Sequence, residues 1–95
     1  MTDVLTKQLA LALDKRLAVY KKCMQDGSIL NNNTEKQMAV FMITEILRPC
    51  CCMICNTNKL EQIFHNTSVF AGNSSVIEEL AKTVYLELAR MNGLG

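Results

Sequence analysis

The sequence predicts an all-α protein, a compact antiparallel bundle of about four helices forming a single domain over residues 1–95. Apolar residues recur at steps of three and four along most of the chain. Two capping-box motifs precede apolar segments, and capping boxes mark helix starts. The 95 residues are 49% hydrophobic and 20% charged, which suits one buried core and excludes a disordered chain.

The first helix is expected over residues 2–25. Asp3 lies near its start, and Lys21 and Lys22 lie near its end, where each charge complements the helix dipole. Gly27 then supplies the stop. The residues expected on its buried face are Leu5, Leu9, Leu13, Leu17, Tyr20 and Met24, with Leu11, Val19 and Cys23 widening the stripe.

The second helix is expected over residues 34–48. Thr34 and Gln37 have the spacing of a capping box, and Arg48-Pro49 ends or kinks the helix. Its sequence is apolar almost all round, which predicts burial on more than one side.

A third helix is expected over residues 50–65, since Pro49 suits a first helical turn and Leu60, Ile63 and Phe64 keep helical spacing. Residues 56–58, the sequence Asn-Thr-Asn, are a point at which this helix can break. A β-strand remains an alternative for the Cys/Met/Ile run, although no neighbouring segment offers a hairpin partner.

The last helix is expected over residues 75–92. Ser75 and Glu78 form the second capping box, and Gly93 closes the helix. Its apolar face is predicted to contain Ile77, Leu80, Ala81, Val84, Leu88 and Met91.

The N-terminal sequence lacks the basic segment and unbroken apolar run of a signal peptide. The longest charge-poor run, residues 50–58, is too short to span a bilayer, so no membrane association is expected. An odd number of cysteines with three adjacent thiols makes a poor disulfide framework. We therefore expect reduced thiols and a cytoplasmic location. The five cysteines are Cys23, Cys50, Cys51, Cys52 and Cys55.

Charge argues against nucleic-acid binding, because the net charge is only +1 and the ten Lys and Arg residues are dispersed. The main basic concentration lies near the end of the first predicted helix. There Tyr20, Lys21 and Lys22, with Arg48 from the second helix, are candidates for holding a small anionic ligand. A solvated helix face explains the same residues equally well.

Four residues could form a zinc site. Cys52 and Cys55 have the C-x-x-C spacing, and Cys23 with His65 would complete a tetrahedral set of three thiolates and one imidazole. Zinc sites usually combine two such pairs, and this chain has one. Core packing of the small, readily buried cysteines is the favoured interpretation, and no cofactor is expected.

Catalysis is not expected, and no catalytic residue is predicted. The chain has one histidine, His65, with no evident nucleophile or acid partner, and it has no Gly-rich phosphate loop. Capping of a helix C-terminus is the simpler role for His65.

The apolar content predicts surfaces that bind other proteins. Both faces of the second helix and the run of residues 50–55 are apolar, so we expect surplus surface to be buried in a homodimer or higher oligomer. Methionines can line adaptable partner grooves, although they more often fill core space. The methionines considered for this role are Met38, Met42, Met53 and Met91.

Size and class therefore favour a small non-enzymatic regulatory or accessory protein that binds and masks or stabilises a protein partner. Inhibitors, immunity proteins, chaperones and phage or viral counter-defence factors share this profile. The expected contacts are the outer face of the first helix and the loops at residues 31–33 and 69–73. One alternative is an oligomer that sequesters a small anion or nucleotide at a subunit interface. A third hypothesis is a zinc-stabilised helical module.

Overall fold

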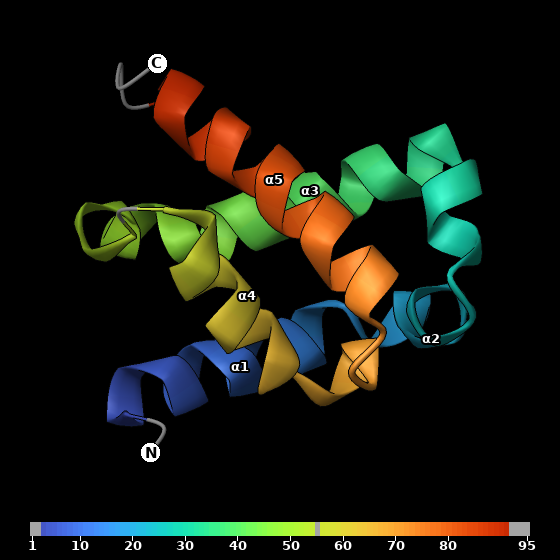
Figure 1. Ribbon diagram of the computed structural model, residues 1–95, viewed down its shortest axis with the longest axis horizontal. Coiled ribbons are helices and arrows are strands. Elements are labelled where there is room, and N and C mark those ends of the chain that lie inside the picture. Colours follow the sequence, from blue (N-terminus) through green and yellow to red (C-terminus); the bar gives the residue numbers. More distant parts are fainter. Residues whose placement is uncertain (1–2, 55, 92–95) are drawn as a thin grey trace.

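The computed structural model describes residues 3–54 and 56–91, and within these ranges it contains helices and no strand (Figure 1). The α-helices are α1 (Val4–Arg16), α2 (Lys21–Asp26), α3 (Asn33–Leu47), α4 (Thr57–His65) and α5 (Ser74–Met91). Four 3₁₀ segments join them: η1 (Ala18–Tyr20), η2 (Ser28–Asn31), η3 (Arg48–Met53) and η4 (Ser68–Phe70). The predicted all-α class is confirmed.

The first predicted helix is divided, so the prediction of one helix over 2–25 is wrong in this respect. Asp3 caps α1 by accepting a hydrogen bond from the Thr6 backbone N–H at 2.7 Å. α1 ends at Arg16 with Leu17 as its C-cap, and η1 then tightens the chain before α2 begins. Gly27, with φ +81°, ends α2 as predicted.

Two residues expected to widen the buried stripe of the first helix are instead in solvent. Leu11 is 64% exposed and Val19 is 80% exposed. Leu13, Leu17 and Met24, at the centre of the predicted stripe, are fully buried. The apolar spacing therefore identified the centre of the buried face, and it overestimated its width.

α3 begins one residue before the predicted start, because its cap is Asn32 and not Thr34. The Asn32 side chain accepts a hydrogen bond from the Glu35 backbone N–H at 3.0 Å. After Leu47 the chain continues through Arg48 and Pro49 into η3, which agrees with proline ending or kinking the helix.

The third predicted helix is also divided, close to the break expected at residues 56–58. Its first part is the 3₁₀ segment η3, and its second part is α4. Asn56 caps α4 by accepting hydrogen bonds from the backbone N–H groups of Asn58 and Lys59 at 3.0 and 3.4 Å. No β-strand replaces the described part of the Cys/Met/Ile run, and Cys55 lies outside the described residues.

α5 agrees with the last predicted helix to within a residue at its start. Asn73 precedes it and accepts a hydrogen bond from the Val76 backbone N–H at 3.4 Å, so the cap is Asn73 and not the predicted Ser75. The predicted end at residue 92 and the stop at Gly93 lie outside the described residues.

The core lies where α1, α3, α4 and α5 meet. Phe64 and Phe70 are fully buried, and their rings pack with centroids 4.9 Å apart. In the described parts of the chain, every buried side-chain nitrogen or oxygen has a hydrogen-bond partner. Thr67 illustrates this, since its hydroxyl donates to the Ile63 carbonyl at 2.7 Å.

The helices cross obliquely in Figure 1, where α5 passes over α3 and both run toward the same side of the molecule. The predicted antiparallel four-helix arrangement is therefore not confirmed. Among the helices described, none combines the length and hydrophobicity needed to cross a membrane.

Candidate binding groove

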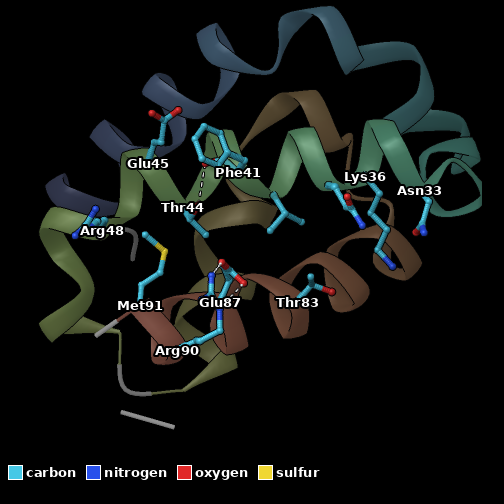
Figure 2. A pocket seen from close by; sticks show the side chains of 12 residues that line it. Asn33, Lys36, Phe41, Thr44, Glu45, Arg48, Thr83, Glu87, Arg90 and Met91 are labelled. Carbon is cyan, nitrogen blue, oxygen red and sulfur yellow. Dashed lines mark hydrogen bonds and ion pairs between the residues drawn. The ribbon is translucent and has the colours of Figure 1, made fainter. Parts of the chain in front are cut away.

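A groove of about 840 Å³ lies between α3 and α5 (Figure 2). Its two walls are built from residues that recur at helical spacing on facing sides of the two helices. From α3 and its C-terminal end come Asn33, Lys36, Gln37, Val40, Phe41, Thr44, Glu45 and Arg48. From α5 come Thr83, Glu87, Arg90 and Met91.

The deep part of the groove is apolar. Val40 is 7% exposed and Thr44 is 2% exposed. The Thr44 hydroxyl donates to the Phe41 carbonyl at 2.8 Å, which satisfies the polar atom locally. Above this floor the Phe41 side chain is 58% exposed, so a large apolar group stands in solvent beside an apolar surface.

The charged side chains along the groove are mostly neutralised by ion pairs. Lys36 pairs with Glu79 of α5 at 3.2 Å, which links the two walls. Glu45 pairs with Arg16 of α1 at 3.1 Å. These pairs compensate the charges of Lys36 and Glu45 on the α3 wall of the groove.

Arg90 and Glu87 pair with each other within α5, as the dashed line in Figure 2 shows. The hydrogen bond from Arg90 holds the pKa of the Glu87 carboxyl below its usual value. The same pair raises the pKa of the Arg90 guanidinium above its usual value. Both groups are therefore charged and mutually neutralised over the physiological range.

Arg48 differs from these residues. It makes no ion pair with any residue in the described parts of the chain. Figure 2 places it at the same end of the groove as Met91, with Lys36 and Asn33 toward the other end. The groove therefore has an apolar floor, balanced rims and one uncompensated positive charge at one end.

The four residues predicted to hold an anion are not brought together. Tyr20 and Lys22 line a separate hollow of about 510 Å³ that also contains the carboxylates of Asp26 and Glu35. Lys21 does not line that hollow, and Arg48 lines the α3–α5 groove instead. Arg48 follows the C-terminal end of α3, whereas the hollow lies at the N-terminal end, beside Asn32 and Glu35. Most of the length of α3, which is about 22 Å in all, therefore separates Arg48 from the hollow.

The four residues predicted to hold zinc are likewise spread out. Cys23 lies on α2, at the opposite end of the molecule in Figure 1 from η3, which carries Cys52. His65 is the last residue of α4, and Cys55 is outside the described residues. Over residues 3–54 and 56–91, no three His, Cys, Asp or Glu side chains are grouped so as to hold a metal ion.

The described cysteines differ in their surroundings. The Cys23 thiol donates to the Tyr20 carbonyl at 3.2 Å. Burial raises the pKa of this thiol, and the nearby Glu35 carboxylate raises it further. Cys52 is exposed, whereas Cys50 and Cys51 are half-buried, and all four of these cysteines are free thiols.

His65 is exposed at the end of α4, where it lines a shallow hollow of about 580 Å³ with Asp3 and Glu61. The helix-capping role predicted for His65 is served at least in part by its neighbour Asn66. The Asn66 side-chain amide donates to the Gln62 carbonyl at 2.8 Å.

Some of the elements predicted to contact a partner are exposed, and others are buried. Val4 and Leu11 on the outer face of α1 are exposed, and residues 31–33 are exposed. Val69 and Phe70 are buried and serve the core. Of the methionines considered for a partner groove, only Met91 lines the α3–α5 groove.

The groove itself was missed from the sequence. The signal that could have indicated it is Phe41, an apolar residue on the same helical side as Gln37, Glu45 and Arg48. No family model, curated protein sequence or solved structure matches the chain. The geometry of the groove is thus the main basis for a functional proposal.

Proposed function

We propose that this chain is a small, non-enzymatic accessory protein that acts in the cytoplasm by binding a protein partner in the α3–α5 groove and masking or stabilising it. The observation that carries the proposal is the exposed Phe41 ring above the nearly buried floor of Val40 and Thr44. A concave apolar surface with charged rims is the usual anatomy of a protein-binding site.

The energetic argument rests on Phe41. Fully burying an apolar side chain of this size contributes about 1.5–3 kcal/mol, and more than half of this side chain is available to a partner. Aromatic residues in water-excluding pockets often carry much of an interface's binding energy. The rim pairs Lys36–Glu79 and Glu87–Arg90 can surround such a contact without leaving a buried charge unpaired.

We also propose that the protein self-associates, through the outer face of α1. Val4 and Leu11 lie two turns apart on that face and are 72% and 64% exposed. A two-fold symmetric contact between the α1 helices of two copies would bury Val4 and Leu11 of each copy. In sedimentation velocity at tens of micromolar, we expect a dimer that Leu11→Lys converts to a monomer. A wild-type monomer at that concentration contradicts self-association and leaves the groove proposal standing.

Photo-crosslinking tests the groove proposal directly. A benzophenone amino acid is placed either at Gln37, an exposed groove residue, or at Lys82, an exposed α5 residue outside the groove. We expect one protein to be crosslinked from position 37 and not from position 82 in cells that express the chain. That protein, once purified, must bind the wild-type chain directly. Equal crosslinking from both positions, or no direct binding, overturns the proposal.

A further inference from the structure

We propose that the occupant of the α3–α5 groove is an amphipathic helix of the partner protein that carries a carboxylate opposite Arg48. This inference rests on the proposed function, since it assumes that the groove binds protein. Beyond that function, it specifies the secondary structure of the bound partner segment, the charge of its key residue and the position of that residue in the groove.

The walls of the groove favour a helix as the occupant. Both walls are helices, whose interior backbone N–H and C=O groups are hydrogen-bonded within each helix. The Thr44 hydroxyl at the floor is also occupied, by the Phe41 carbonyl. The helical walls therefore offer an extended peptide no backbone edge to pair with, and only side chains such as Asn33 and Gln37 could bond its backbone. A helix brings its own backbone hydrogen bonds already made, so it fits this groove better.

The charge of the groove specifies the complementary residue. Lys36, Glu45, Glu87 and Arg90 already have ion-pair partners, so Arg48 carries the uncompensated charge among the described lining residues. A guanidinium forms bidentate hydrogen bonds with a carboxylate, and that geometry gives orientation as well as attraction. A basic residue of the partner at this place would meet an unpaired like charge.

The spacing along α3 predicts where that carboxylate lies. Phe41 and Arg48 are seven residues apart, about 10 Å along the helix axis. A partner helix aligned with the groove would therefore present an apolar residue at Phe41 and Asp or Glu about two turns away, at Arg48. The recognised pattern is thus an apolar stripe with one acidic residue at its end.

A peptide selection tests this inference. The probe is a library of 18-residue alanine-based helices, randomised on one face and displayed on phage, selected against the whole chain. We expect the selected peptides to share an Asp or Glu seven residues from a large apolar residue. In methyl NMR they should shift the signals of Val40 and Met91, which lie in the groove.

Two variants that each remove one positive charge, one inside the groove and one outside it, supply the matched comparison. We expect Arg48→Gln to weaken the selected peptide at least tenfold, and Lys82→Gln, which removes an exposed charge outside the groove, to change affinity less than twofold. Arg48→Glu should prefer the same peptide with its acidic residue changed to Lys.

The possible failures are distinguishable. Peptides that bind the groove with no acidic preference and no response to Arg48→Gln overturn this inference alone. Shifts confined to another surface, or no selected peptide, overturn the proposed function as well. Val40 and Met91 signals that move with protein concentration in the absence of peptide place a second copy in the groove and overturn the partner-helix assignment.

Discussion

Asp14 of α1 holds the backbone of Ser68, fifty-four residues later, at the start of η4. Its carboxylate accepts hydrogen bonds from the Ser68 N–H at 3.1 Å, the Ser68 hydroxyl at 2.9 Å and the Val69 N–H at 2.7 Å. Val69 and Phe70 follow directly and are buried in the core. One surface carboxylate thus fixes the loop that delivers two core side chains.

Replacement of Asp14 by Ala should destabilise the fold by about 1–3 kcal/mol, because hydrogen bonds to a charged acceptor are lost and the Val69 N–H is left without its partner. Urea unfolding followed by circular dichroism measures the change. Lys15→Ala, an exposed neighbour on the same helix, is the control and should change stability by less than about 0.5 kcal/mol. Equal stabilities of the two variants would contradict the role given to Asp14.

The lowered pKa of the Asp3 carboxyl predicts a loss of folding stability in acid. Hydrogen bonds from the Thr6 backbone and side chain, followed by one from Lys59, lower the pKa of the Asp3 carboxyl from 3.8 to about 2. Because the folded-state pKa is the lower one, the stabilisation is present above about pH 4 and is lost as the pH falls toward 2. The carboxyl should titrate near pH 2 when followed by NMR.

Asp3→Asn provides the matching stability measurement. The variant should be less stable than the wild type at neutral pH, and the difference in urea midpoint should shrink between pH 4 and pH 2. A difference that stays constant over this interval would show that the carboxylate charge does not contribute.

The thiols should react in a defined order. Cys52 is exposed, whereas burial and the Glu35 carboxylate raise the pKa of the Cys23 thiol and reduce its thiolate fraction. At pH 8, iodoacetamide should modify Cys52 at least tenfold faster than Cys23, as read by tandem mass spectrometry. Cys52→Ser should leave the rate at Cys23 unchanged. Comparable rates at the two wild-type residues would contradict the described burial.

Phe41 and Phe64 should respond very differently to truncation. Phe64→Ala removes a fully buried ring that packs against Phe70, and it should cost about 3–5 kcal/mol. Phe41→Ala removes a ring that is mostly in solvent, and it should cost less than about 1 kcal/mol. Thermal or urea unfolding of the two variants checks this. A large loss for Phe41→Ala would make it a core residue and remove the main support for the groove.

Hydrophobic periodicity predicted the fold class and the last helix well because α5 has one strongly apolar face, centred on Ile77, Leu80, Val84 and Leu88. It could not reveal the interruption at Leu17. A single tightened turn preserves the apolar spacing, so Leu13, Leu17 and Met24 have the same pattern whether or not the helix is continuous.

Both predicted caps lie two residues after the observed ones, for a related reason. Asn32 and Asn73 lie just before the predicted capping residues Thr34 and Ser75, and asparagine competes well for the same backbone N–H groups. Sequence alone did not decide between neighbouring candidates.

Tertiary geometry creates the groove, and it also separates the residues that the sequence grouped into a zinc site and an anion site. Phe41 belongs to a helix that is apolar almost all round, and only the arrangement of α5 against α3 leaves its ring exposed. Residue chemistry groups Cys23 with Cys52 in a zinc site, and Lys22 with Arg48 in an anion site. The fold places the two members of each pair at different ends of α3. Composition indicates which chemistry is available, and helix packing decides which residues meet.

The most direct measurement of the central claim is the affinity of the crosslinked partner for three forms of the chain, determined by calorimetry. We predict that Phe41→Ala weakens binding at least tenfold, about 1.4 kcal/mol, because it removes the exposed ring from the groove. Leu86→Ala, which removes a 68%-exposed apolar side chain outside the groove, should change affinity less than twofold. Unchanged affinity for Phe41→Ala, or an equal loss for Leu86→Ala, would contradict the assignment of the α3–α5 groove as the partner-binding surface.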